Sequence, residues 1–541
     1  MADATYDAVI IGGGNKGLIL TMYLLKYGGM DVAIFERKHE AGGGWCTDEG
    51  ATAGFLADYH ASGVGALHQT ATERDFPEWQ ELGGKLNEVK IGTGAIFKED
   101  DSCLVTYNRL ADPSRERTAE SIARFSQKDA ETWVKTVPKL YRAFLPALFE
   151  WMYNPPPPPG KPDTLEKLLS DPNSGFDPSW ASKSPLEVAQ DIFESDAMIS
   201  MILRNGMSWG FFPDIKGWGI IPTVVMFLAV NPRTAGVAGG THNWAHTATK
   251  IILSNGGKIF TEHEVNKVLI ENGKATGISL SNGTQVRARK LIVSTLDPYN
   301  LCFRLIGKEY LNSEILQKVE NIERRYTCIT WYTWALHELP KYKAASINPD
   351  INEAMNLVII NKDPQALVQE QTTRMLGKMP DELELQVMNY STVDKLRVPQ
   401  GKYSVLTEQF VLPANALTER EWFEFKKSHA QDVMKFWQKH TTNMSWDNVI
   451  GYMPITPYDI CGLVNMAPTG NWAVIDNIPS QLGKFRPIPE LAGYKTPIKN
   501  LYATGSAWHP FGGAGDWQGY NCYKVIAEDF ELKKPWKEHP W

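Results

Sequence analysis

Cysteine is scarce and scattered in this chain. Only six of the 541 residues are cysteines, and they lie far apart, without a Cys-x-x-Cys pair or a dense cluster. A disulfide-stapled scaffold is therefore not expected, because such scaffolds concentrate many cysteines in a short sequence. This cysteine usage is typical of a reducing compartment, and we expect a cytoplasmic protein.

The chain also has no excess of positive charge and no long apolar run. The 55 lysines and arginines are outnumbered by 62 acidic residues, which leaves a net charge of −7 and no basic footprint for nucleic acid. The longest uncharged stretch, Gly217–Pro232, is shorter than the roughly 20 apolar residues that cross a bilayer. The first apolar run, Ala8–Ile11, has only the length of a strand and leads into glycines, unlike a signal peptide. We expect neither a membrane span nor a targeting segment.

The N-terminal residues have the pattern of a β-α-β unit. Tyr6–Ile11 is an apolar strand, Leu18–Leu25 an apolar helix, and Asp31–Phe35 a second strand that leads into Glu36. Such an alternation predicts a parallel sheet. The overall balance of 43% hydrophobic and 22% charged residues is that of a globular protein, and this length allows two or three structural units.

The turn between the first strand and the helix meets the dinucleotide-binding fingerprint. Its glycines, Gly12, Gly14 and Gly17, have the spacing Gly-x-Gly-x-x-Gly. The first permits the sharp turn, the second lets the backbone approach a pyrophosphate, and the third lets the helix pack on the sheet. Glu36, at the end of the next strand, supplies a carboxylate for a ribose. Together these features predict a dinucleotide cofactor.

Further strands that suit the same sheet occur far along the chain. Short β-like pieces recur within Lys258–Asp297 and at Asn500–Thr504, whereas residues 100–230 are helical and 300–480 mixed. We therefore predict an α/β (α+β) fold with a Rossmann-like FAD-binding domain built from discontinuous segments and an inserted, mixed substrate-binding domain. The predicted segments are 1–100, 231–300 and 481–541 for the first domain, and 101–230 and 301–480 for the second.

The residues after the second strand resemble an extension typical of FAD-containing amine oxidases and phytoene desaturases. In those families an acidic–basic pair is followed by glycines that run along the flavin side of the cofactor. The pair here is Glu36-Arg37, and the glycines are Gly42, Gly43 and Gly44. The resemblance implies FAD rather than a nicotinamide cofactor.

Three separated blocks together resemble the phytoene-desaturase-like flavoproteins, in the branch that includes the pyridine nucleotide-disulfide oxidoreductase domain-containing protein 2 group. The blocks run from the N-terminus to Gly54-Phe55, from Gly256 to Pro298, and from Asn500 to Pro510. The resemblance places the backbone of Val265 at the adenine and Gly505 in the closing flavin motif. It implies FAD, a two-domain fold, and redox or isomerase chemistry on apolar substrates such as carotenoids, terpenes and retinoids.

Two departures from that family's pattern point to a different substrate from that of carotenoid desaturases. Asn15-Lys16 stand where relatives often have His-Asn, and Asp516, Trp517 and Tyr520 bring an acid and two bulky aromatics to a usually plain glycine-rich stretch. Gly512–Gly519 should open the last helix, with its N-terminal N–H groups toward the flavin. Because its glycine spacing misses the fingerprint by one residue, no separate NAD site is expected. The electron acceptor is then a quinone, oxygen or a redox protein.

Candidate catalytic residues gather in the closing motif and after the glycine-rich extension. His509, Asp516 and His60 are candidates for acid–base work at the flavin. Asp516 has the competing role of an N-terminal helix cap. The side chains expected to wall an apolar substrate pocket are Trp508, Trp517 and Tyr520.

His242 and His246 have the i, i+4 spacing of metal ligands on a helix. No glutamate lies between them, and their segment matches cofactor binding. We therefore expect no metal.

Two apolar segments, Tyr141–Tyr153 and Gly217–Val230, allow two interpretations. Each can line a substrate tunnel or pack in the core, or each can lie in a bilayer interface, where Trp and Tyr are favoured. Neither has the Lys/Arg-rich face of an interfacial helix, which favours the tunnel or core. Peripheral membrane contact stays an alternative.

The preferred function is an FAD-dependent oxidoreductase that dehydrogenates or desaturates a hydrophobic, isoprenoid or cyclic small molecule. A flavin-dependent isomerase or hydratase, an amine oxidase, and a non-catalytic flavoprotein scaffold are the alternatives. Substrate identity and oligomeric state, including a homo-oligomer, stay open.

Overall fold

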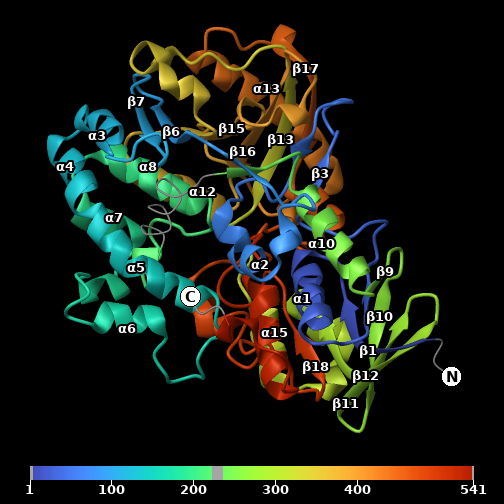
Figure 1. Cartoon of the computed structure of the whole chain (residues 1–541). Helices are drawn as coiled ribbons and strands as arrows, with labels where there is room; N and C mark the ends of the chain where they lie inside the picture. The colour runs from blue at the N-terminus through green and yellow to red at the C-terminus, as the bar shows by residue number, and fades with distance from the viewer. Residues whose placement is uncertain (1–3, 218, 222–234, 539–541) are drawn as a thin grey trace.

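Two large β-sheets organise this computed structural model, which describes residues 4–217, 219–221 and 235–538 (Figure 1). One sheet lies at the lower right of Figure 1, near the N-terminus, and the other at the top. The mixed α/β class predicted from the sequence is confirmed.

The first sheet has the order β10-β11-β12-β1-β2-β9, with β18 also paired to β12. Its strands are β1 (Ala4–Ile11), β2 (Val32–Phe35), β9 (Lys258–Phe260), β10 (Val265–Glu271), β11 (Lys274–Leu280), β12 (Gln285–Ser294) and β18 (Leu501–Ala503). β1 pairs in parallel with β2 and β12, and β9 and β18 extend the parallel part, whereas β10 and β11 are antiparallel. Strands from three distant segments thus form one sheet, as the sequence pattern predicts.

The helices beside this sheet are α1 (Asn15–Lys26), α10 (His242–Ser254) and α15 (Trp517–Asp529). α1 packs against both of the others. A Cβ placed on Gly519 would lie 2.7 Å from the carbonyl oxygen of Lys16, so α1 and α15 approach each other as closely as only glycine allows. This contact joins the first and last segments of the chain.

The second sheet has the order β17-β13-β16-β15-β14-β6-β7. Its strands are β6 (Ile91–Phe97), β7 (Cys103–Tyr107), β13 (Ile329–Leu336), β14 (Asn356–Ile360), β15 (Leu385–Met388), β16 (Tyr403–Phe410) and β17 (Val449–Ile455). β6 and β14 run parallel, and the other pairs are antiparallel. Two small sheets pair β3 (Thr47–Asp48) with β4 (Ala57–Asp58) and β5 (Leu86–Glu88) with β8 (Ala235–Val237).

The predicted domain border at residue 100 does not match the membership of the sheets. β6 and β7 form a hairpin in the second sheet, so the chain has left the first sheet before Ile91. The passage of the chain from the first sheet to the second cannot be recognised in the sequence, because every residue of β6 is buried, like those of β2 in the first sheet. A short apolar run predicts a buried strand without saying to which sheet it belongs.

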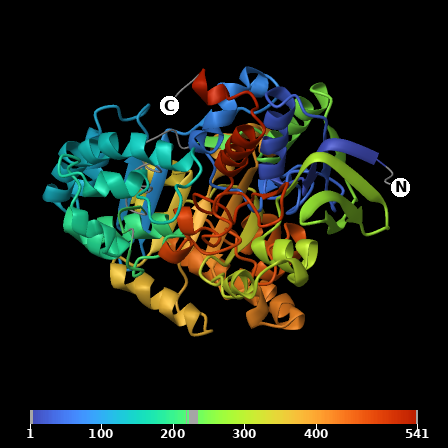
Figure 2. The same ribbon diagram turned by 90° about the horizontal axis from the view of Figure 1, so that it is seen from below.

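Helices cover the second sheet from two sides. α13 (Glu419–His440) begins with a capping box of Thr418 and Glu421 and packs its buried face, which includes Val433 and Trp437, against this sheet's core. The other core cluster beside this sheet includes residues of α3 (Glu116–Ala123), α4 (Gln127–Lys135), α7 (Pro185–Ile192), α8 (Asp196–Met207), α12 (Pro364–Met375) and α14 (Pro457–Leu463). The core of the first sheet instead includes residues of α2 (Thr70–Asp75), α5 (Val137–Met152), α6 (Thr164–Ser170) and α11 (Ser313–Glu320). Figure 2 shows the C-terminal segment, in red, between the group α3–α8 and the N-terminal unit.

Most of the apolar stretch Gly217–Val230 lies outside the described residues, so its interpretation as tunnel, core or interface stays a prediction. Within residues 4–217, 219–221 and 235–538, no helix combines the length and the apolar character needed to cross a bilayer.

Candidate active site

A cavity of about 700 Å³ opens where β1, β2 and the start of α1 meet. Most of the cofactor-binding residues predicted from the sequence line it: Gly12, Gly14, Glu36, Arg37, Gly43, Gly44, Val265 and Gly505. The cavity therefore lies at the carboxyl ends of parallel strands, which is where open α/β sheets bind ligands.

The space in front of Gly14 fits a phosphate group. Gly14 has φ −66° and ψ 169°, a conformation open to any residue, and an added Cβ would meet no protein atom within 4 Å. It would instead point into the cavity, beside the N–H groups at the start of α1. Gly12 needs its φ of +94°, and a Cβ on Gly17 would lie 2.4 Å from the oxygen of Gly12. Gly14 thus leaves room for a ligand, whereas Gly12 and Gly17 shape the turn.

The Glu36 carboxylate is fixed before any ribose binds. One oxygen accepts a hydrogen bond from the N–H of Gly13 at 2.7 Å, and the other accepts one from the N–H of Lys38 at 2.9 Å. These bonds tie β2 to the glycine turn and orient the carboxylate along the cavity wall. The residues present fit the adenosine-phosphate half of FAD.

Three other predicted cofactor residues support the cavity from behind. Gly17 and Gly519 allow the close backbone contacts already described. Gly42, with φ +139°, donates its N–H to the oxygen of Gly13 and so holds the glycine-rich extension against the first turn. They do not line the cavity.

The unusual pair Asn15-Lys16 holds the C-terminal glycine stretch. The Asn15 side chain donates to the oxygen of Ala514 at 3.1 Å, and the Lys16 ammonium donates to the oxygen of Gly513. Burial lowers the pKa of Lys16 to about 7. The two departures from the family pattern are therefore coupled, because one segment binds the backbone of the other.

A second cavity, of about 490 Å³, lies between the first sheet's C-terminal loops and the second sheet. Tyr141, Leu145 and Phe149 line it from successive turns of α5. One face of the segment Tyr141–Tyr153, predicted from the sequence to line a tunnel or pack in the core, therefore lines this cavity. Trp209 and Trp331 add further apolar wall. The cavity suits a small molecule that is largely apolar.

The two cavities meet at three residues, His60, Gly513 and Ala514, which line both. His60 Nδ1 lies 3.4 Å from the oxygen of Gly44, and its ring packs against Trp331 with centroids 5.6 Å apart. Among the residues that the structure describes, the buried Nε2 has no hydrogen-bond partner, and burial lowers the pKa of the imidazole to about 4. A neutral imidazole thus stands at the junction.

His509 is not at this junction. Its side chain is buried, lines neither cavity, and donates from Nε2 to the oxygen of Trp151 at 2.8 Å. Burial lowers its pKa to about 4. The predicted catalytic role does not match this placement, because the ring is hydrogen-bonded to the backbone of Trp151 near the end of α5.

Asp516 lines neither cavity. It occupies the N-cap position of α15, as the competing interpretation expects, but its side chain makes no capping hydrogen bond to that helix. Its carboxylate accepts hydrogen bonds from the N–H of Thr72 at 2.8 Å, the Thr72 hydroxyl at 2.9 Å and the Tyr153 hydroxyl at 2.9 Å. It is fully buried, and burial raises its pKa to about 7. Asp516 therefore joins the start of α15 to α2 and to the residue that follows α5.

The predicted pocket aromatics lie in the core. Trp508, Trp517 and Tyr520 are fully buried, and none lines either cavity. Trp508 donates to the oxygen of Leu491, and Tyr520 accepts from Arg74. The sequence prediction differs from the structure here because aromatic residues near a flavin motif do not reveal which way they point.

Sequence reasoning missed Glu408 and His68. Glu408 lines the second cavity from β16, accepts a hydrogen bond from the Ser62 hydroxyl at 2.6 Å, and has its pKa raised by burial. His68 lines the same cavity between Trp209 and Trp517, with ring centroids 5.4 Å from each. Neither lies in a motif, so no local signal marks them.

Comparisons with known proteins agree with this geometry. A family model for FAD-NAD(P)-binding matches residues 9–129. A limonene dehydrogenase subunit of Castellaniella defragrans is 24% identical over 98% of this chain and 96% of its own. Pyridine nucleotide-disulfide oxidoreductase domain-containing protein 2 of Rattus norvegicus is 24% identical over 97% of this chain and 94% of its own. A 4,4'-diapophytoene desaturase of a Methylomonas species is 25% identical over 36% of this chain and 34% of its own.

Solved structures show the same fold. An oxidoreductase from Methanosarcina mazei matches 96% of this chain and 99% of its own with a TM-score of 0.58 at 16% identity. Putrescine oxidase matches 97% and 99% with a TM-score of 0.59 at 12% identity. The resemblance stated from the sequence is confirmed, as is FAD as the cofactor. With its glycine cradle and paired cavities, this chain is an FAD-dependent oxidoreductase similar to the desaturase-like flavoproteins.

Proposed function

We propose that the protein dehydrogenates a hydrophobic cyclic or isoprenoid small molecule in the second cavity. The observation that carries this proposal is the junction at His60, Gly513 and Ala514, where that cavity meets the cofactor cavity. A substrate on the α5 side would approach the cofactor past these residues. The name of the relative limonene dehydrogenase supports the same substrate class.

The cofactor, when bound, supplies a two-electron acceptor for hydride. His60 is our candidate for the accompanying proton, because its unpaired Nε2 lies at the junction and its low pKa leaves it unprotonated near neutral pH. The apolar walls of the cavity exclude water and orient the substrate. His509 and Asp516, which were expected to share this work, position α5, α2 and α15 instead.

The electron acceptor is proposed to be a quinone, oxygen or a redox protein. Support comes from the closing glycine stretch, whose residues Gly512 and Gly513 face the cavities rather than forming a second strand–turn–helix fingerprint. The limonene dehydrogenase relative is one subunit of its enzyme, which supports testing for a redox protein partner.

Anaerobic incubation of the FAD-loaded protein with limonene and related monocyclic terpenes tests the proposal. Bleaching of the flavin at about 450 nm together with a desaturated product is the expected result. Product formed by protein whose flavin has first been reduced chemically, with the flavin still reduced at the end, would mark an isomerase or hydratase. Bleaching by primary amines but by no terpene would favour an amine oxidase, and no reaction with either class would favour a scaffold.

A further inference from the structure

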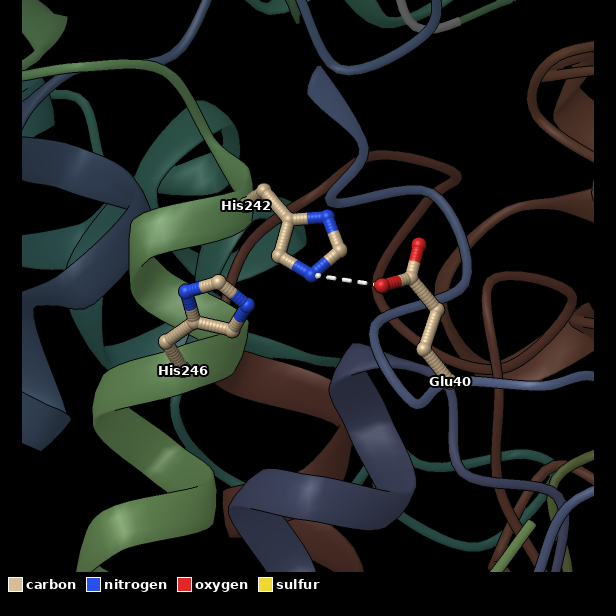
Figure 3. Close-up of side chains that lie close together, drawn as sticks. All are labelled: Glu40, His242 and His246. Atoms are coloured by element: carbon tan, nitrogen blue, oxygen red, sulfur yellow. Dashed lines mark ion pairs between the residues drawn. The ribbon is translucent and has the colours of Figure 1, made fainter. Parts of the chain in front are cut away.

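One carboxylate and two imidazoles come together at the rim of the cofactor cavity (Figure 3). Glu40 belongs to the loop after β2, and His242 and His246 lie one turn apart at the start of α10. Oε2 of Glu40 is 3.3 Å from Nε2 of His242, and the two ring centroids are 4.3 Å apart. One potential ligand atom of each side chain lies within 4.8 Å of the others. The i, i+4 spacing marks the two histidines in the sequence, but it does not reveal Glu40, which comes from a distant segment.

Other contacts hold the two segments in place. The N–H of His242 donates to the Thr47 hydroxyl at 3.0 Å, and that hydroxyl donates to Asp58 at 2.5 Å. Asp58 is in turn paired with the buried Arg397 at 2.9 Å. The loop that carries Glu40 and the helix that carries the histidines are thus positioned independently of the cluster, which is the support that a preformed ligand set needs.

The donor set suits a divalent transition metal. Two imidazole nitrogens and one carboxylate oxygen, with a fourth position left to water, are typical of zinc. With metal–ligand distances of about 2.1 Å, tetrahedral ligand atoms lie about 3.4 Å apart. The Glu40–His242 pair already has this separation. His246 is exposed, so its side chain is free to rotate toward the other two.

The charges around the cluster also suit a cation. Glu40 supplies the negative charge, and His39 faces its other oxygen at 3.7 Å. Lys250, one turn beyond His246 on α10, is the nearby cationic group that opposes binding.

We propose that Glu40, His242 and His246 bind one divalent ion, preferably Zn²⁺, which clamps the loop 36–47 to α10. All three side chains line the cofactor cavity, on the wall that also carries Gly43 and Gly44. The ion ties down this wall and places positive charge beside a cavity that holds an anionic dinucleotide. It therefore slows the loss of FAD, and it takes no part in electron transfer.

Metal titration of tag-free, EDTA-treated, FAD-loaded protein provides the test. We expect one Co²⁺ per chain with the visible absorption of a tetrahedral site, and one Zn²⁺ by calorimetry that displaces it. His242→Gln and His246→Gln should each weaken affinity at least tenfold. His337→Gln is the control, because it removes an exposed histidine that follows β13 of the second sheet and does not line the cofactor cavity, and its affinity should be unchanged.

Release of FAD on dilution gives a second readout, followed by recovery of FAD fluorescence. Zn²⁺ should slow release several-fold in the wild type and leave His246→Gln unaffected. The proposal is wrong if the wild type binds no stoichiometric ion, or if His246→Gln binds as well as the wild type. It is equally wrong if the ion binds only FAD-free protein and is displaced by FAD, because the side chains would then belong to the cofactor site. Circular dichroism checks folding, and Glu40→Gln provides an independent variant.

Discussion

The two cavities of this protein are built in opposite ways. The walls of the cofactor cavity include glycines of short segments that follow strands, namely Gly12, Gly14, Gly43, Gly44 and Gly505. The walls of the second cavity include residues of helix α5, the loop that begins at His60, and strands β13 and β16, with no shared local pattern. Glycine turns that bind a ligand through the backbone can thus be recognised from a short stretch of sequence, whereas an apolar cavity assembled from distant segments cannot.

The largest effect is expected in the cofactor cavity, from Gly14→Val. The new side chain would fill the space proposed for the pyrophosphate without meeting protein atoms, so FAD should be lost while the fold is kept. Absorbance at about 450 nm and circular dichroism measure the two effects. Gly17→Ala is the control, because its Cβ would collide with the oxygen of Gly12 and should destabilise the protein itself. Stoichiometric FAD in Gly14→Val would contradict this assignment of the cavity.

A pair of tryptophan variants tests where the second cavity ends. Trp517→Ala should cost about 3–5 kcal/mol of folding free energy, because a fully buried side chain leaves a void. Trp209→Ala, on the cavity wall, should keep the melting temperature nearly unchanged and instead alter KM for the terpene substrate. Thermal melts and steady-state kinetics separate the two. A stable Trp517→Ala with changed KM would return Trp517 to the pocket.

His60→Gln should slow anaerobic reduction of the flavin by the best terpene about 100-fold, which is the usual scale for a lost general base. FAD content and melting temperature should stay close to those of the wild type. Stopped-flow spectroscopy gives the rate. His509→Gln is the matched control and should react at nearly the wild-type rate, because His509 lines neither cavity. Equal rates for His60→Gln and the wild type would remove His60 from the chemistry.

The smallest effect is expected in the acid stability of His509→Gln. Burial holds the pKa of His509 near 4 in the folded protein, against an ordinary 6.5. The unfolded chain therefore takes up a proton first as the pH falls, and stability is lost progressively between about pH 6.5 and pH 4. The variant should show a shallower fall of melting temperature over this interval. His39→Gln, at an exposed position, should keep the wild-type slope, and an identical slope for His509→Gln would contradict the buried, neutral imidazole.

The sequence was least informative about side-chain direction. The sequence predicts site roles for His60, Asp516 and Trp517 by similar reasoning. His60 does reach the junction, whereas Asp516 and Trp517 are buried in the core. The strand-turn-helix pattern fixes backbone conformation over a few residues and says little about the neighbours that a later segment brings. Asp516 meets Thr72, Glu408 meets Ser62, and Glu40 meets His242 across long stretches of chain.

The sequence by itself determined the parallel β-α-β opening, the glycine turns, the carboxylate of Glu36 and hence the cofactor class, because each depends on residues close together in the chain. Only the tertiary structure decided that β6 joins the second sheet, that Asn15 and Lys16 hold the Gly513-Ala514 backbone, and that the two cavities meet at His60. These features depend on packing between distant segments, whose energy is set by shape and burial rather than by local spacing.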